Sequence, residues 1–186
     1  MPLLGHRLFF ALRPSRSACE AMAEYRDCYR HAGDSVVSDR RLHVTLAVTP
    51  LVDRIDAQAV DHLHAIGARV ALDPFPILFD RISCWRGNDG RGSLMLRPSQ
   101  RTRAMRSLSR ALSKPLCRSG LLLPGWRFDP HATLLYGRTA PFETQVLPVC
   151  WGADSFVLIH SLVGESRHLE YGRWPLRSNQ LAFAFD

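Results

Sequence analysis

The segment Leu42-His43-Val44-Thr45-Leu46 recurs with little change as Pro130-His131-Ala132-Thr133-Leu134. Because side chains alternate between the two faces of an extended strand, the histidine and threonine of each copy share one face, about 7 Å apart along the backbone. Each copy therefore combines a group that exchanges a proton near neutral pH with a small hydroxyl donor. If the two strands lie side by side, two imidazoles face one substrate.

The length and composition indicate a single domain, residues 1–186, that can consist of two similar lobes. Hydrophobic residues make up 46% of the chain, as in an ordinary soluble protein, and no apolar run reaches the length of a membrane span. The N-terminal stretch MPLLGHRLFFALRP has neither a basic leader nor a small-residue cleavage site, so we expect a first strand rather than a signal peptide.

The cysteines are odd in number and scattered: Cys19, Cys28, Cys84, Cys117 and Cys150. None belongs to a Cys-x-x-Cys pair, which disfavours a disulfide framework or a zinc site. We therefore expect a cytoplasmic protein that needs no metal or other cofactor. No feature of the sequence implies a membrane or an obligate protein partner, and we expect a monomer.

The formal net charge is +7, and Lys114 is the only lysine among 24 basic residues. Arginine binds phosphate through two hydrogen bonds and stacks on bases, so the positive charge favours a nucleic-acid or nucleotide partner. The preference for arginine over lysine can also reflect genome base composition. Four arginines predict a basic helix face that is either simply solvated or attracts RNA: Arg101, Arg103, Arg106 and Arg110.

Hydrophobic periodicity and turn residues predict the order of the elements. We expect strands over residues 7–13, 42–48, 75–85, 93–97, 132–136, 156–162, 168–176 and 181–185. We expect helices that begin at a capping box at Ser17, at Ala57 and at Pro98-Ser99. A strand and a helix precede the first motif, and a hairpin and a helix precede the second. This order predicts a duplicated α+β fold: two similar lobes of antiparallel sheet, with flanking helices, around a central cleft.

The paired motifs suit the cleavage of a phosphodiester without a metal. One neutral histidine can take a proton from the nucleophile, and one protonated histidine can give a proton to the leaving oxygen. The threonine hydroxyls can bind the non-bridging oxygens, where negative charge grows in the transition state. No third ligand stands at metal-binding spacing near either motif. A single His-x-Thr would be uninformative, whereas two copies on predicted strands indicate a catalytic site.

This pattern resembles the 2H phosphoesterase superfamily, which is named for its paired His-x-Thr/Ser motifs. Within it the chain is most similar to the RNA 2′,3′-cyclic phosphodiesterase family, also called the 2′-5′ RNA ligase family. The resemblance extends beyond the two motifs to a first strand at residues 7–11 and to closing strands at residues 156–161 with Tyr171 and Trp174.

The resemblance implies a bilobal fold and metal-independent hydrolysis of a 2′,3′-cyclic phosphodiester, at RNA ends or on small nucleotides, to a 2′-phosphomonoester. His43 and His131 fall on the catalytic histidines, and Thr45 and Thr133 fall on the hydroxyls that bind the phosphate oxygens. By analogy His131 is the base that activates water and His43 is the acid that protonates the leaving ribose oxygen. Ligation, the reverse direction, would use the same groups with their roles exchanged.

The chain departs from the family pattern beside each motif. Ala47 and Tyr136 stand where the family often has arginine, and Arg138 could supply the missing charge. We expect Tyr136 to stack on a base and Arg138 to hold a phosphate. Phe9 could line the base pocket, although a first-strand phenylalanine is more often part of the core. Another cyclic or 2′-5′-linked nucleotide therefore stays open as the substrate.

Two other kinds of protein also remain possible. One is a binding module that has kept nucleotide affinity without turnover. The other is a metal-dependent hydrolase that uses Asp61, His62 and His64. Residues two apart on a helix point in different directions, so we expect His62 and His64 to be surface residues. We expect His160, on an apolar strand face, to be a buried histidine with a partner.

Overall fold

The computed structural model describes residues 5–87, 90–100 and 102–177. The helices are α1 (Arg16–Tyr29), the 3₁₀ turn η1 (Asp39–Arg41), α2 (Ala57–Ala68) and α3 (Arg103–Arg118). The strands are β1 (Gly5–Leu12), β2 (Ser35–Val36), β3 (Val44–Val48), β4 (Phe75–Arg86), β5 (Gly92–Arg97), β6 (Ala132–Gly137), β7 (Phe142–Ala153), β8 (Ser155–Val163) and β9 (Arg167–Pro175).

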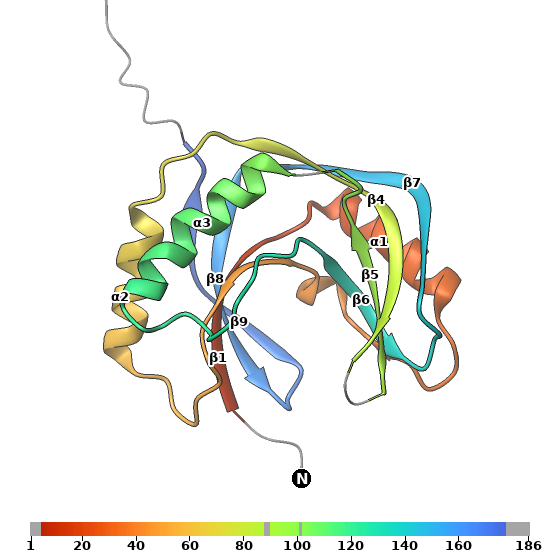
Figure 1. Cartoon of the computed structure of the whole chain (residues 1–186), viewed down its shortest axis with the longest axis horizontal. Helices are drawn as coiled ribbons and strands as arrows, with labels where there is room; N and C mark the ends of the chain where they lie inside the picture. The colour runs from red at the N-terminus through yellow and green to blue at the C-terminus, as the bar shows by residue number, and fades with distance from the viewer. Residues whose placement is uncertain (1–4, 88–89, 101, 178–186) are drawn as a thin grey trace, which may run out of the picture.

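The strands form one antiparallel sheet in the order β7-β4-β5-β6-β3-β1-β8-β9, and β2 pairs with β6. The order divides between β6 and β3 into two sets of four strands. We call β3, β1, β8 and β9 the first-motif half, and β6, β5, β4 and β7 the second-motif half. Helices α2 and α3 pack on the first-motif half and α1 packs on the other (Figure 1). The expected duplicated α+β fold is confirmed.

The apolar side chains separate onto two faces of this sheet because strand residues alternate. The larger cluster lies between the sheet and the helices and includes Phe10, Leu46 and Leu134, all fully buried. A smaller cluster lies on the opposite face of the first-motif half, where Phe9 packs with Ile159. The outer face of β3 and β6 is thus sealed by helices, and the inner face is left for the motif side chains.

Several predicted boundaries were wrong for local reasons. Helix α1 is capped by Ser15, whose Oγ accepts from the N–H of Ala18 at 3.2 Å, so no capping box forms at Ser17. Helix α3 begins at Arg103 and not at Pro98, because both the backbone N–H and the hydroxyl of Ser99 donate to Asp80. The first motif strand begins at Val44, after a 3₁₀ turn.

The long strand β7 was not predicted, because it is an edge strand with many exposed polar residues. The strand expected at 181–185 and Arg101 lie outside the described residues. In the part of the chain that the structure describes, no helix is both long and apolar enough to span a bilayer. All five cysteines are free.

Candidate active site

The two motifs meet where the halves of the sheet join. Strands β3 and β6 run antiparallel with Val44 opposite Ala132, and this is their one pairing within the described residues. The register therefore sets Thr45 opposite His131 and sets His43 opposite Thr133. The two copies are related by an approximate twofold axis through the Val44–Ala132 pair. Each histidine consequently faces the threonine of the other motif.

Alternation along the strands gives the four motif side chains a common face. Val44 and Ala132 are fully buried against the helices, whereas the histidines and threonines beside them are only partly buried. The His131 side chain is 33% exposed. The structure thus brings His43, Thr45, His131 and Thr133 together, as the sequence predicted. Their catalytic role stays a prediction.

The two imidazoles are held in the same way. Nδ1 of His43 lies 2.6 Å from the carbonyl oxygen of Arg41, and Nδ1 of His131 lies 2.9 Å from that of Asp129. A carbonyl oxygen can only accept, so each Nδ1 carries the hydrogen. In the neutral ring, Nε2 then keeps its lone pair and is free to take a proton. Both histidines therefore offer Nε2 for chemistry.

His43 lies in an apolar and positively charged environment. The Phe9 ring is 4.9 Å from the His43 ring, and the His168 ring is 5.4 Å from it, edge-on. Burial lowers the pKa of His43 to about 4, against the bond to the Arg41 carbonyl, and the charge of Arg13 lowers it further. A charge on His131 also lowers this pKa, which reflects how near the two rings are. His43 is therefore neutral at pH 7.

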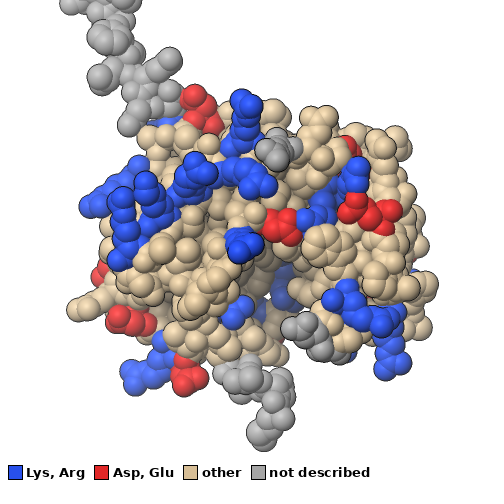
Figure 2. All heavy atoms as spheres, viewed as in Figure 1, with Lys and Arg blue, Asp and Glu red and all other residues tan. Residues whose placement is uncertain are grey.

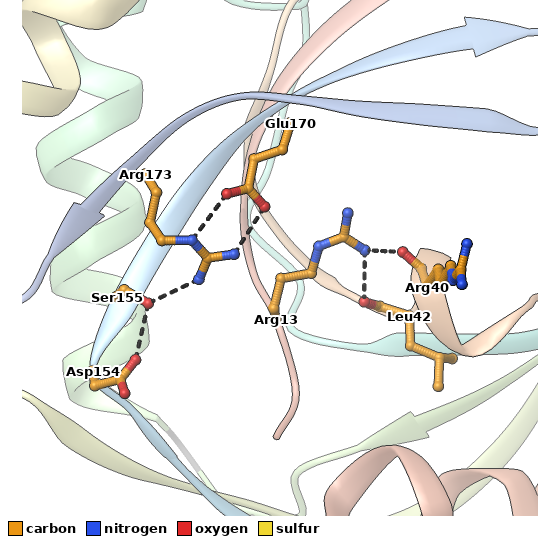
Figure 3. A network of polar contacts seen from close by, with 7 residues as sticks. All are labelled: Arg13, Arg40, Leu42, Asp154, Ser155, Glu170 and Arg173. Atoms are coloured by element: carbon orange, nitrogen blue, oxygen red, sulfur yellow. Dashed lines mark hydrogen bonds and ion pairs between the residues drawn. The ribbon is translucent and has the colours of Figure 1, made fainter. Parts of the chain in front are cut away.

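Arg13 fixes the turn that presents His43. Its guanidinium donates to the carbonyl oxygens of Arg40 at 2.5 Å and of Leu42 at 3.3 Å (Figure 3). Burial lowers the pKa of Arg13, and the carboxylate of Glu170 opposes that shift. Glu170 is itself held by two hydrogen bonds from Arg173, the shorter at 2.8 Å. Arg13 thus holds the turn before the first motif, and the Glu170 carboxylate of β9 acts on Arg13 through its charge.

His131 has a carboxylate beside it instead. An oxygen of Asp129 lies 4.0 Å from its Nδ1, and Asp129 pairs with Arg97. The Arg97 guanidinium lies over the Trp85 ring, 4.1 Å from the centroid. Burial lowers the pKa of His131 and the Arg97 charge adds to this shift, whereas the bond to the Asp129 carbonyl and the Asp129 charge counteract it. His131 therefore holds a proton more readily than His43 does.

A β-bulge turns Tyr136 toward the motif face. Met95 pairs with Thr133 while Ser93 pairs with Tyr136, so the register shifts by one residue at Leu134. Because Ser93 and Met95 share a face of β5, Tyr136 shares the face of Thr133. Strand β4 lies on the other side of β5 from β6, and its Trp85 also pairs with Ser93. The face thus presents two aromatic rings across three strands, with Trp85 49% and Tyr136 41% exposed.

Arg138 lies just beyond the end of β6 and is exposed. Tyr136 and Arg138 both line a recess of about 800 Å³ with Arg91, His31 and Asp34. The structure therefore brings these two predicted residues together, at the far end of the strand from His131. The rise of a strand places Tyr136 about 10 Å from Thr133.

Phe9 reaches the site and packs near the His43 ring, but it is only 6% exposed. It therefore presents little surface on which a base could stack. His168 was missed by the sequence reasoning. It lies on β9 with its ring 5.4 Å from that of Phe9, and its buried Nδ1 has no hydrogen-bond partner among the described residues. Burial lowers the pKa of His168 to about 3. The sequence around His168 contains no motif that predicts a site residue there.

The remaining histidines lie elsewhere. His160 is buried as predicted, and bonds His6 at 2.8 Å and the Tyr171 hydroxyl at 2.9 Å. His62 is exposed on α2, whereas His64 is half-buried against Trp174. Within residues 5–87, 90–100 and 102–177, no three His, Cys, Asp or Glu side chains are grouped to hold a metal ion.

Comparison with known proteins identifies the family of the chain and the class of its fold. The family model described as the 2′-5′ RNA ligase superfamily matches residues 14–165, which include both motifs. The chain therefore belongs to the 2′-5′ RNA ligase superfamily, a group of 2H phosphoesterases. A search of curated protein sequences found no match.

Solved structures show the same fold at low sequence identity. LigT of E. coli complexed with 3′-AMP is 24% identical over 94% of this chain and 99% of its own, with a TM-score of 0.75. A protein described as a phosphoesterase is 23% identical over 94% and 99%, with a TM-score of 0.78. The protein TT0787 of Thermus thermophilus is 20% identical over 93% and 99%, with a TM-score of 0.74. At this identity the likeness establishes the fold alone.

Proposed function

We propose that the protein hydrolyses a 2′,3′-cyclic phosphodiester, at an RNA end or on a small nucleotide, to a 2′-phosphomonoester without a metal ion. One observation carries the proposal. Two histidines with free Nε2 atoms each face a threonine of the other motif across the Val44–Ala132 pair. Such an arrangement can act on one phosphorus atom from two sides.

The proposed step needs only water and the two imidazoles. The water oxygen attacks phosphorus and loses a proton to the neutral histidine. The bond between phosphorus and the ribose O3′ breaks, and the protonated histidine gives a proton to that oxygen. The hydroxyls of Thr45 and Thr133 bind the non-bridging oxygens as their charge grows. Proton transfer back through solvent restores both histidines.

The surroundings of the histidines favour roles opposite to those drawn from the family resemblance. His43 is neutral because of burial and the nearby arginine charges, which suits a base. Burial lowers the pKa of His131 as well, but the Asp129 carboxylate beside it opposes that shift, so of the two rings His131 is better suited to hold a proton and act as the acid. A bound phosphodiester anion favours protonation of both rings, and this effect adds to the Asp129 charge at His131. We therefore assign His43 as the base and His131 as the acid.

The second-motif half supplies the substrate contacts in this proposal. Trp85 and Tyr136 are exposed on the motif face, and base–aromatic stacking does not require a particular base. Arg138 stands beyond Tyr136 and can hold a phosphate of a small nucleotide that is bound there. That E. coli LigT has been solved with 3′-AMP, phosphate and ATP supports a nucleotide as the ligand class.

The test is turnover of a 2′,3′-cyclic mononucleotide, followed by ³¹P NMR against 2′- and 3′-phosphate standards. We expect the 2′-monophosphate, formed at an equal rate with and without a chelator. The blank is the His43→Ala/His131→Ala double variant. A 3′-monophosphate product or loss of activity with the chelator would contradict the mechanism. Binding without turnover by the wild-type protein would identify a nucleotide-binding module instead.

Ligation is the second candidate, because the family model carries the name of that reaction. The 5′-hydroxyl of a second RNA end would replace water as the nucleophile and give a 2′-5′ linkage. Adding a 5′-hydroxyl oligonucleotide to the same assay separates the two outcomes. A joined product that resists a 3′-5′-specific nuclease indicates ligation.

A further inference from the structure

Helix α3 carries an unusual charge for a helix that packs on the core. Its sixteen residues include five basic side chains and no acidic one. All five are exposed: Arg103, Arg106, Arg110, Lys114 and Arg118. The opposite side of α3 packs into the core through Leu108 and Leu112. Lys and Arg side chains gather over α3 in Figure 2.

Within the described part of the chain, these charges are not neutralised by acidic side chains. No carboxylate of residues 5–87, 90–100 or 102–177 forms an ion pair with the basic side chains of α3. By contrast, α1 pairs Arg16 with Glu20 and Arg26 with Asp27. The basic surface of α3 is therefore available to an anion from outside.

The pattern on α3 costs the helix stability. Arg106, Arg110, Lys114 and Arg118 follow one another at intervals of four residues, so each repels the next. Each such like-charge pair costs about 0.2–0.5 kcal/mol in isolated helices. Arg103 stands in the first turn, where the helix dipole disfavours a positive charge. A charge pattern that opposes its own helix indicates an external anionic partner.

The basic surface begins beside the second motif. A hollow of about 190 Å³ is lined by Arg106 on α3, by Arg97, and by Asp129 and Pro130, which directly precede His131. A second hollow of about 330 Å³ lies farther along the helix, between Arg110, Lys114 and Arg118. The five basic residues extend over about 22 Å of helix, at 1.5 Å per residue. A stacked nucleic-acid strand covers that length with about six nucleotides, at roughly 3.4 Å each.

We propose that the basic face of α3 binds the phosphates of a single RNA strand whose cyclic end lies at the two motifs. This proposal rests on the proposed function and specifies the substrate class as an oligonucleotide. The strand would leave the active site past Pro130 and follow α3 from Arg106 toward Arg118. The protein would then prefer an RNA end over a free cyclic nucleotide.

The experiment compares two substrates with the same reacting group: a 2′,3′-cyclic mononucleotide and an eight-residue RNA that ends in the 2′,3′-cyclic phosphate. The test variant is Arg106→Gln/Arg110→Gln/Lys114→Gln. The control variant, Arg16→Gln/Arg30→Gln/Arg54→Gln, removes the same charge from exposed positions outside α3. Circular dichroism and thermal unfolding confirm that both variants are folded.

We expect the wild-type protein to favour the oligonucleotide in kcat/KM, with a preference that falls as salt rises. The salt slope is the slope of the logarithm of the affinity against the logarithm of the salt concentration. Each phosphate that is neutralised on a single strand adds about 0.7 to this slope, so removing three charges from α3 should reduce the slope by about 2. Between 50 and 200 mM salt, the affinity of the α3 variant for the RNA should therefore fall about 20-fold less than that of the wild type. Turnover of the mononucleotide should be unchanged in the α3 variant, and the control variant should behave as wild type.

Binding separates this inference from the proposed function. Fluorescence anisotropy with a labelled eight-residue RNA that ends in a 3′-phosphate needs no turnover, and it can use the His43→Ala/His131→Ala protein. If the wild type turns over neither substrate but the salt slope of RNA binding still depends on the charges of α3, the proposed function is wrong and RNA binding by α3 is supported. If both substrates are turned over equally, or both charge variants lose the same slope, the α3 proposal is overturned.

Discussion

The two halves of the molecule carry the same motif in different surroundings. In the first-motif half, His43 is enclosed by Phe9 and His168, and the nearby charges are arginines. In the second-motif half, His131 is 33% exposed and has the carboxylate of Asp129 beside it. The backbone contact is nevertheless alike, because each Nδ1 bonds the carbonyl two residues earlier.

Under the proposed function, this difference would let the duplicated site divide the roles of acid and base. The repeated bond to Nδ1 fixes both rings with Nε2 free, and the unlike neighbours then set which ring holds a proton. The halves also differ in what they offer a substrate. In the first-motif half the Phe9 ring is buried, whereas the second-motif half presents the exposed rings of Trp85 and Tyr136.

Removing either histidine tests whether both halves take part. We expect His43→Ala and His131→Ala each to lower kcat about 10²–10⁴-fold, because each variant loses one positioned proton transfer. The measurement is the turnover of a 2′,3′-cyclic mononucleotide. His62→Ala, an exposed histidine on α2, is the matched control and should keep wild-type turnover. If one of the two single variants stays fully active, the paired mechanism is wrong.

The threonines test whether the two halves share one phosphate. Thr45→Val and Thr133→Val keep the side-chain shape and remove the hydroxyl donor. We expect each to lower kcat by about 10²-fold, near the lower end of the effect of losing one oxyanion donor. Thr45→Ser and Thr133→Ser keep the donor and should recover most of the activity. A loss confined to one motif would show that only one half binds the reacting oxygens.

The sequence predicted the features that depend on local periodicity. Alternation along a strand is a local rule, so the common face of His43 and Thr45 could be read directly. Helix α2 and the hairpin of β4 and β5 followed from spacing and turn residues in the same way. To predict that the two motif strands pair, it was also necessary to recognise that the chain is duplicated.

The missed features depend on contacts between distant segments. The bulge at Leu134 arises from pairing with β5, and alternation alone would have turned Tyr136 away from Thr133. Trp85 joins the face through Ser93, and His168 reaches His43 from β9. The start of α3 was placed too early because the bonds from Ser99 to Asp80 could not be foreseen.

The exposed rings test the recognition role of the second-motif half. Base–aromatic stacking is worth about 1–3 kcal/mol per base, so Trp85→Ala and Tyr136→Ala should each raise KM about 5- to 150-fold. Turnover at saturation should change little. Leu78→Ala, another exposed apolar residue of β4, is the control. A cyclic phosphate diester without a base should show no effect in either variant, and an equal effect there would exclude stacking.

The enclosed rings of the first-motif half predict loss of stability in acid. The unfolded chain protonates histidine below about pH 6.5. Folded His43 and His168 stay neutral down to about 4 and about 3. The unfolded state therefore binds more protons as the pH falls, and the folded state loses stability. Each histidine adds a slope of up to about 1.4 kcal/mol per pH unit near pH 5.

Urea unfolding between pH 7 and pH 4 measures this slope. His168→Phe keeps a ring in place and removes one titrating group, so its slope should be smaller than that of the wild type. His62→Gln removes an exposed histidine and should leave the slope unchanged. A stability that is independent of pH in this range would mean that the two rings are accessible to protons in the folded state.

The carboxylate beside His131 gives the smallest effect and decides the roles. Two charges 4 Å apart interact by about 1 kcal/mol even at the dielectric constant of water, which equals about 0.7 of a pH unit. Asp129→Asn should therefore lower the pKa of His131 by roughly that amount. If His131 is the acid, the alkaline limb of the bell-shaped rate profile moves to lower pH and the acidic limb stays. Movement of the acidic limb alone would restore the opposite assignment. Asp61→Asn, on the exposed side of α2, controls for the change in net charge and should move neither limb.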